Sequence, residues 1–457
     1  MDKRQPLPSH TSEHTMLERS ERMKTNRLSW LVRHSSLMNP PLRNLVRKMH
    51  RHGNKNRKVR VIVQFQKKLT SSSIQALQKQ LGASELPVKR RIAFLNCIAS
   101  DVSLTCLKRM CGCKGIQKIY LDGVKKVSLT VATPSIGSAA GRRLKGIDGR
   151  GINVGVIDTG VYPHPDLTRP RNRIVAFKDF VRGRRRPYDD NGHGTHLAGD
   201  IAGNGRSSRG KIRGPAPGAG IVAIKAFNSA GDAYDSTIIR AIEWSIRNRK
   251  RLGLRVLTLS FGGTATTRCS EDPLCQAVEK AVRAGIVVVT AAGNSGPKRG
   301  SIESPGNSPS AITVGSVDDR RSIRQSDDNI TFYSSRGPAA GGVAKPDLVA
   351  PGESITSLRA PRSRQDRETP HLRVGRHYFL LSGTSVSAAI VAGAAAQLLQ
   401  QRPTLTPRQV KSILKRHASP LPFSPNAVGS GEVNVRFLLR NAGRRPRLSS
   451  MRNRLKI

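Results

Sequence analysis

Short apolar runs alternate with longer mixed segments along most of the chain from residue 149 onward. The runs 221–226 and 286–291 are almost continuously apolar, which is typical of parallel strands buried on both faces. The longer segments between such runs, including 236–248 and 272–284, are predicted to be helices. This alternation predicts an α/β fold with a mostly parallel central sheet and helices on both of its faces.

Residues 58–128 have a different pattern, in which shorter strands and helices follow one another closely. The predicted elements are strand, helix, strand, helix and strand, at 59–65, 71–81, 92–99, 103–110 and 116–121. This β-α-β-β-α-β-like order is typical of a small ferredoxin-like α+β domain. The sequence therefore predicts a small domain that precedes a larger one.

A serine stands where one predicted strand of the larger domain gives way to a helix. Residues 377–381 are predicted to be a short strand, Gly383 permits a tight turn, and the Ala-rich run 388–399 is predicted to be a closely packed helix. Ser385 would then lie at the start of the helix, where backbone N–H groups can face a developing anion. The position also suits a serine that only caps the helix, and a nucleophile would need a histidine and a carboxylate from elsewhere.

Two other junctions carry an acid and a histidine. Asp158 ends the apolar run that begins at Val154, and His193 lies between two glycines at a predicted loop-to-helix junction. Ends of strands and starts of helices form the rim where open α/β sheets build their sites. We therefore expect Asp158, His193 and Ser385 to meet there as orienting acid, general base and nucleophile.

His196 and two nearby acids offer competing interpretations. His193 and His196 invite a metal site, but the His-Glu-x-x-His spacing of helical zinc proteases is absent, so we expect His196 to be packed or hydrogen-bonded. Asp189 and Asp190 are predicted to be solvated turn residues, with a cation site as the alternative. No metal and no cofactor is expected for catalysis, while a structural calcium ion stays open without a clear motif.

These motifs resemble those of the subtilisin-like serine proteases (subtilases, peptidase S8 family), whose chain order Asp, His, Ser has subtilisin as its standard example. The resemblance covers residues 145–440. Other segments that match the family are 259–263, 291–296, 333–338 and 345–352, while 162–167, 188–192 and 214–217 are most similar to the bacterial intracellular branch typified by the AprX proteases. The resemblance implies a serine endopeptidase that works through an acyl-enzyme intermediate and is made as a self-processing precursor.

The resemblance also assigns roles around the substrate. Asn294 is implied as the side-chain oxyanion donor. Residues Ser260, Phe261, Gly262 and Gly263 are implied to line an extended substrate strand, as is the segment 230–234. Phe261 is expected to line an apolar pocket, which favours apolar or aromatic side chains before the cleaved bond.

The sequence departs from the family pattern just after the nucleophile. Val386, Ser387 and Ala389 stand where the family usually has methionine, a small residue and proline. A proline in the first helical turn pre-sets φ and does no chemistry, so we expect a slightly altered helix start and retained activity.

The family further implies how the chain is divided. Residues 58–128 are predicted to be an inhibitory prodomain whose tail occupies the substrate cleft, with an unrelated accessory domain as the alternative. Residues 129–148 are predicted to be a linker with the self-cleavage site, and 149–440 the catalytic domain. Basic segments at 1–57 and 441–457 are predicted to form an N-terminal arm and a C-terminal tail.

The charge of the chain suggests a different class of partner. With 79 Lys and Arg against 30 Asp and Glu, the formal net charge is +49. Such a field attracts nucleic acid, anionic membranes or acidic proteins, although a solvated basic surface is the simpler interpretation. Only 4% of residues are aromatic, which argues against a base-stacking platform. A weak or inert protein that binds polyanions is thus the alternative to a protease acting on polypeptides.

Location and cysteine chemistry are predicted together. No apolar stretch is long enough for a signal peptide or a membrane span, which predicts a cytoplasmic protein, with release by a non-standard route as the alternative. Six reduced cysteines are then expected, with a Cys269–Cys275 bridge as a minor alternative.

Near residues 30–32 and 42–49, short basic helices are expected to form a packed arm or to dock on a membrane surface.

Overall fold

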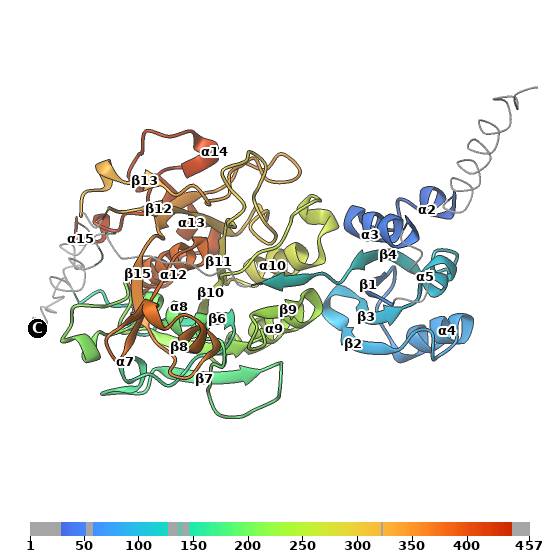
Figure 1. The fold of residues 1–457 in the computed structure, drawn as a ribbon, viewed down its shortest axis with the longest axis horizontal. Coiled ribbons are helices and arrows are strands. Elements are labelled where there is room, and N and C mark those ends of the chain that lie inside the picture. The colour runs from blue at the N-terminus through green and yellow to red at the C-terminus, as the bar shows by residue number, and fades with distance from the viewer. Residues whose placement is uncertain are drawn as a thin grey trace, which may run out of the picture. The chain divides into compact units, whose positions relative to one another are not determined.

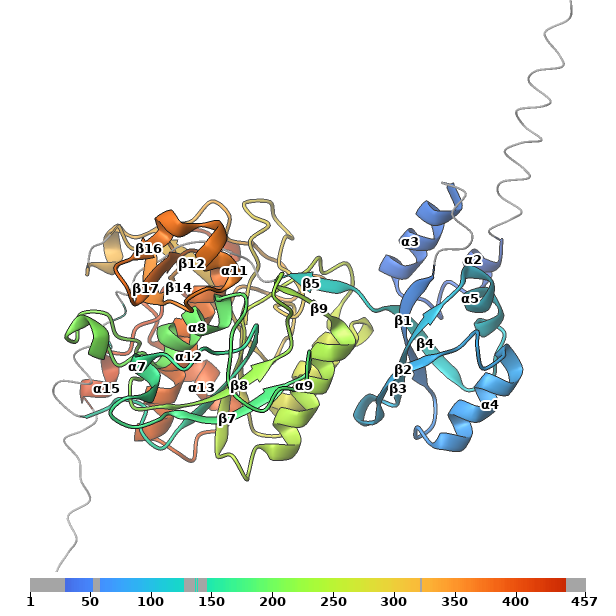
Figure 2. The same ribbon diagram turned by 60° about the horizontal axis from the view of Figure 1, so that its bottom comes forward.

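The computed structural model describes residues 29–51, 58–126, 136, 138, 146–320 and 323–440. The chain divides into two compact units, residues 1–123 and 124–457. Figures 1 and 2 show the elements of both units. Most of the predicted linker and the whole C-terminal tail lie outside the described residues, so the predicted self-cleavage segment has no structural account.

The first unit is built on an antiparallel sheet with the strand order β2-β3-β1-β4. Its strands and helices are β1 (Val59–Phe65), α4 (Ser71–Leu81), β2 (Val88–Ile92), β3 (Cys97–Val102), α5 (Leu104–Met110) and β4 (Ile116–Leu121). This is the β-α-β-β-α-β order of a ferredoxin-like domain, as predicted. The single strand predicted at 92–99 is wrong, because Asn96 adopts a left-handed conformation (φ 55°) and a short 3₁₀ turn (Ala93–Leu95) separates β2 from β3.

Two helices precede this sheet and share its core. The helices are α2 (Ser29–Arg33) and α3 (Pro40–Arg51). Trp30, Leu42 and Val46 are buried in one cluster with Val61 of β1 and Ile119 of β4. Burying these apolar side chains stabilises the unit and leaves the basic residues of α3 outward. The described part of the predicted arm is therefore packed.

The second unit contains an eight-stranded sheet with the order β13-β12-β11-β10-β6-β8-β7, in which β14 also pairs with β12. Its strands are β6 (Asn153–Asp158), β7 (Ile174–Asp179), β8 (Gly220–Lys225), β10 (Leu254–Leu259), β11 (Val287–Ala291), β12 (Ile312–Asp318), β13 (Asn329–Ile330) and β14 (Leu348–Pro351). Every pairing is parallel except that of β12 with β13. The predicted parallel α/β sheet is confirmed.

Helices cover both faces of this sheet. The longer ones are α8 (His193–Ala202), α9 (Asp235–Asn248), α10 (Pro273–Arg283), α12 (Thr384–Gln401) and α13 (Pro407–Arg416). Figure 1 shows α8, α12 and α13 on one side of β6, β10 and β11, with α9 and α10 on the other. Residues 384–399 of α12 are all buried, because their small side chains let the surrounding elements approach closely.

Shorter elements complete the second unit. They are β5 (Val124–Lys126), α7 (Pro165–Thr168), β9 (Asp232–Tyr234), β15 (Ile355–Leu358), α11 (Arg364–Glu368), β16 (Arg373–Val374), β17 (Tyr378–Leu381), α14 (Pro425–Val428) and α15 (Phe437–Arg440), with 3₁₀ turns at Arg206–Ser208, Cys269–Glu271, Gln325–Asp327 and Pro370–Leu372. Strands β15, β17 and β16 form a small antiparallel sheet that the sequence pattern did not predict.

Two further observations bear on the sequence-based expectations. Cys269 and Cys275 are joined in a disulfide, so the expectation that all six cysteines are reduced is wrong for this pair. The 3₁₀ turn and Asp272, which caps α10, fold the intervening residues back and bring the two Cα atoms to 5.2 Å. Within the described residues, no helix is long and apolar enough to span a bilayer.

Candidate active site

Ser385 lies in the first turn of α12, directly after strand β17. Gly383 links the two with a φ of 148°, which favours glycine. The residue before the serine, Thr384, begins the helix, and the Ser385 side chain is almost completely buried, at 1% exposed. The strand, turn and helix predicted from the sequence therefore exist and aim the serine at the rim of the sheet.

The structure brings the three predicted catalytic residues together. His193 Nδ1 lies 2.9 Å from Asp158 Oδ1, and His193 Nε2 lies 3.2 Å from Ser385 Oγ. Because Nδ1–H donates to the carboxylate, Nε2 is left to accept the hydroxyl proton of the serine. Asp158 ends β6 and His193 begins α8, so the rim predicted from strand ends and helix starts holds all three groups.

The close approach of α8 to the end of β6 depends on a glycine. A Cβ atom added to Gly194 would lie 2.2 Å from the backbone oxygen of Gly160 and 3.1 Å from the Asp158 side chain. The Gly194 N–H instead donates to Thr159 Oγ1 at 2.9 Å. The glycine after His193 thus permits the separation that the histidine–aspartate hydrogen bond requires.

Burial and charge act in opposite directions on the histidine. Complete burial disfavours the protonated imidazole, but the Asp158 carboxylate and its hydrogen bond outweigh burial and raise the pKa of His193 above its ordinary value. Asp158 Oδ1 also accepts the Thr159 N–H at 2.7 Å, which fixes the carboxylate. The site is therefore arranged to stabilise an imidazolium ion.

The loop before His193 is held by Asp189, which corrects a sequence-based expectation. Asp189 is buried rather than solvated, and its two oxygens accept hydrogen bonds from Thr159 Oγ1, the Asn191 and Gly192 N–H groups, and both the N–H and hydroxyl of Thr195. These donors satisfy the carboxylate and cap the start of α8. Asp190 forms an ion pair with Lys225 Nζ at 2.6 Å.

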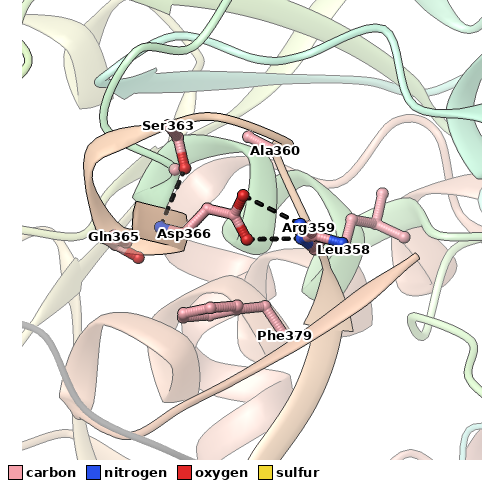
Figure 3. Close-up of a pocket in the computed structure, with 8 residues that line it drawn as sticks. Leu358, Arg359, Ala360, Ser363, Gln365, Asp366 and Phe379 are labelled. Atoms are coloured by element: carbon pink, nitrogen blue, oxygen red, sulfur yellow. Dashed lines mark hydrogen bonds and ion pairs between the residues drawn. The ribbon is translucent and has the colours of Figure 1, made fainter. Parts of the chain in front are cut away.

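A second segment, which contains α11, braces the same loop, and Figure 3 shows the ion pair between its Arg359 and Asp366. Asp366 forms a two-point ion pair with Arg359 and accepts further hydrogen bonds, which together outweigh burial and lower the pKa of Asp366 to about 2. Gln365 Nε2 then donates to Asn191 Oδ1 at 2.8 Å. This brace fixes the approach to His193 without contacting the histidine ring.

His196, the rival base, is fully engaged elsewhere. Its Nδ1 lies 2.8 Å from Asp200 Oδ2, and its Nε2 lies 3.2 Å from the Ile355 carbonyl oxygen. The predicted hydrogen-bonded role of His196 is confirmed. Among the described residues, no group of three or more His, Cys, Asp and Glu side chains is arranged to hold a metal ion.

Asn294, the predicted oxyanion donor, is oriented by the residue next to the nucleophile. Asn294 Oδ1 accepts the N–H and the hydroxyl of Thr384, both at 3.0 Å. Since the oxygen is occupied, the Nδ2 group is the end that can donate. Thr384 Oγ1 also accepts the Gly293 N–H at 3.2 Å. Thr384 therefore ties Asn294 and its neighbour Gly293 to the start of the nucleophile helix.

The predicted substrate-lining residues follow β10. Ser260 Oγ donates to the Ser385 carbonyl oxygen at 2.9 Å, which ties this segment to the nucleophile. Gly262 and Gly263 are partly exposed, while the Phe261 ring is 1% exposed and packs against Phe227. Contact of these residues with a substrate stays a prediction.

Sequence reasoning missed one acid beside this segment. Glu303 Oε1 accepts the Asn294 N–H at 3.1 Å and the Ser295 hydroxyl at 2.6 Å. It lies in the irregular chain between β11 and β12, so no periodic pattern marks it. Backbone contacts of Glu303 with Ala292 and of Ser304 with Gly263 bring it to the site, and neither contact is encoded locally.

Comparison with known proteins assigns the larger part of the chain to a family. A model of the subtilase family matches residues 149–437, the part of the chain that contains every site residue described above. The chain is a subtilase. The match covers more than half of the sequence.

Individual relatives support the same assignment. This subtilase is 41% identical to serine protease AprX of Bacillus subtilis over 391 residues, which covers 83% of this chain and 87% of that one. It is 36% identical to subtilisin DY of Bacillus licheniformis over 64% of this chain and 92% of that protein. The chain is therefore a subtilisin-like serine endopeptidase, and the predicted similarity to AprX is confirmed.

A solved structure supports the fold. Fervidolysin from Fervidobacterium pennivorans superposes with a TM-score of 0.66 at 22% identity, covering 84% of this chain and 61% of that one. The departures after the nucleophile fit this fold. Val386 and Ala389 are buried, and Ser387 Oγ donates to the Ala350 carbonyl oxygen at 3.0 Å. The subtilase start of α12 thus forms without the proline.

Proposed function

We propose that this subtilase cleaves polypeptides through Asp158, His193 and Ser385. Ser385 Oγ attacks the carbonyl carbon of the peptide bond while His193 Nε2 takes its proton, and Asp158 stabilises the imidazolium that forms. His193 then gives the proton to the leaving amine, which leaves an acyl-enzyme that water hydrolyses by the same route. The observation that carries the proposal is the pair of contacts at 2.9 and 3.2 Å on either side of the histidine ring.

Asn294 supplies the charge stabilisation in this proposal. Its Nδ2 group and the Ser385 N–H donate to the oxyanion of the tetrahedral intermediate. The hydrogen bonds from Thr384 to Oδ1 hold the amide so that it need not reorganise when charge develops. Catalysis therefore depends on groups from four separate places: the end of β6, the start of α8, the segment after β11 and the start of α12.

The first unit acts as an inhibitory prodomain in the same proposal, and the chain processes itself. Support comes from β5, the strand that directly follows that unit. Within the second unit, β5 pairs antiparallel with β9, and Val124, Lys125 and Lys126 lie opposite Tyr234, Ala233 and Asp232 (Figure 2). Backbone pairing of this kind accepts any side chains, so a substrate strand can use the same edge. The β5 segment and a substrate strand then compete for the same edge of β9.

The alternative of an inert polyanion-binding protein gives no reason for this arrangement. A buried carboxylate, imidazole and hydroxyl in hydrogen-bond contact are costly to desolvate, and a binding surface has no need of them. The net charge of +49 would still steer acidic polypeptides toward the protease.

Intact-mass spectrometry of the wild type beside Ser385→Ala tests the proposal. After incubation in matched buffers, the wild type should lose about 130 to 140 N-terminal residues, because the first unit ends at Gly123 and the predicted linker follows it. The Ser385→Ala chain should stay whole. If both chains stay whole and neither cleaves casein at any salt concentration, the catalytic assignment is refuted.

A further inference from the structure

Glu303 lies between the two segments that flank the nucleophile. Its N–H donates to the Ala292 carbonyl oxygen at 2.9 Å, and the next residue, Ser304, exchanges hydrogen bonds of 2.8 and 3.1 Å with Gly263. The backbone of Glu303 is thus fixed to the segment before Asn294 on one side and to the substrate-lining segment on the other. Its side chain has little freedom to leave this place.

Two glycines make room for the Glu303 side chain. A Cβ atom added to Gly262 would lie 2.2 Å from Glu303 Oε2, and one added to Gly293 would lie 2.5 Å from Glu303 Cγ and Cδ. Neither glycine could be replaced without displacing the carboxylate. The contact with Gly262 also shows that Oε2 reaches the strand along which the substrate is proposed to lie.

The charge of Glu303 has no ionic partner. Its Oε1 atom accepts hydrogen bonds from the Asn294 N–H and the Ser295 hydroxyl. Across the part of the chain that the structure describes, no lysine, arginine or histidine forms an ion pair with it, although the chain has 79 Lys and Arg. A carboxylate that is 9% exposed and lacks a cation is costly unless a cation reaches it in use.

We propose that Glu303, with Gly262 and Gly293, forms a specificity site that selects a lysine or arginine side chain immediately before the cleaved bond. This inference rests on the proposed proteolytic function. The carbonyl of that substrate residue must lie at Asn294 and Ser385, so its side chain leaves the backbone beside the two glycines. Glu303 Oε2 stands where a long cationic side chain would end, and an acid at the end of such a site pairs with it directly.

This assignment replaces the preference for apolar side chains that Phe261 suggested. The Phe261 ring packs against Phe227 with a centroid separation of 4.8 Å and is 1% exposed, so it contributes to the core. The side chain nearest the two glycines is the acid. Steady-state cleavage of matched peptides that differ only in the residue before the cut measures the preference.

The test compares Glu303→Gln with the wild type on peptides that carry arginine, lysine, leucine or phenylalanine at that position. Glutamine can still accept both hydrogen bonds at Oε1 and removes only the charge. We expect the wild type to prefer arginine and lysine, and the ratio of kcat/KM for arginine over leucine to fall by about 10- to 100-fold in Glu303→Gln. Glu271→Gln, which removes an acid already paired with Arg268, is the control and should leave the ratio unchanged.

The outcomes separate the possible explanations. A uniform loss of kcat on all four peptides would mean that Glu303 only positions Asn294, and it would overturn the proposal. So would a wild type that prefers leucine or phenylalanine and keeps that preference in Glu303→Gln. A wild type that cleaves none of the peptides, and no casein, would refute the proteolytic function itself. Thermal melting of both variants shows whether each is folded.

Discussion

Two acids far from the active site should make stability fall as pH rises. Glu432 and Asp328 are 0% and 2% exposed, so both carboxyl groups are almost completely removed from water. Burial, followed by the neighbouring Asp328, raises the pKa of Glu432 well above its ordinary 4.5, and burial also raises the pKa of Asp328. The pair therefore holds one shared proton in the folded state at neutral pH.

Charges around the pair do not remove this effect. Asp318, Asp319 and Asp327 add negative potential that favours the proton, and Arg320 opposes them only in part. In the unfolded chain both carboxyls ionise above about pH 5. Above that pH the folded state binds one more proton than the unfolded state. The stability that this proton contributes is fully present below the carboxyl pKa of the unfolded chain, and it is lost as pH rises toward the raised pKa of the folded pair.

The magnitude follows from this one-proton difference. Each pH unit within the window costs about 1.4 kcal/mol of stability, so the step from pH 6 to pH 8 costs about 2.7 kcal/mol. Glu432→Gln removes the titration and can donate its amide hydrogen to Asp328. Relative to the wild type, the variant should therefore become more stable by about 2.7 kcal/mol between these two pH values.

Urea unfolding followed by circular dichroism at pH 6 and pH 8 measures this difference. All chains should carry Ser385→Ala so that self-digestion does not interfere. Glu368→Gln is the matched control, because the Glu368 side chain is 57% exposed and pairs with Arg364 only at the surface. If Glu432→Gln and its parent have parallel pH profiles, the shared proton does not exist and the reasoning is wrong.

Two predictions concern the catalytic groups. Thr384→Val removes the hydroxyl that donates to Asn294 Oδ1, so kcat should fall by about 10-fold while KM stays nearly unchanged. Steady-state kinetics on one peptide measures both constants. An effect on KM alone would contradict this prediction. The acid limb of the kcat/KM–pH profile should have its midpoint above the ordinary histidine pKa of 6.5. The raised pKa of His193 keeps the imidazole protonated to higher pH, and only the neutral imidazole can act as a base. A midpoint below 6.5 would contradict this prediction.

Much of the fold was predictable because its strongest signals are local. The continuous apolar runs gave β6, β8 and β11 within a residue or so. The start of α13 is a local signal of the same kind, because Thr406 caps the helix and Pro407 is its first residue. The catalytic residues were predictable for a related reason. A polar side chain directly after a buried strand, or at the first turn of a buried helix, can only point to the rim of the sheet.

What could not be predicted depends on contacts between distant segments. Asp189 was expected to be solvated because it is an acid in a turn, yet its position beneath α8 gives it five donors. Glu303 reaches the site because its own N–H bonds Ala292 and because Ser304 pairs with Gly263, 41 positions earlier. Strand β7 lies at the edge of the sheet and is buried only in part, so its apolar signal is weak.

The burial of α12 has a consequence for how this protein can change. The helix that carries Ser385 is also the central packing element of the larger unit, with residues 384–399 enclosed on every side. Most enlargements along it would disturb the nucleophile and the surrounding sheet together. Directed evolution of the enzyme therefore has little freedom on this helix, and new specificities are more accessible through exposed irregular segments, where a side chain can be exchanged without repacking the interior.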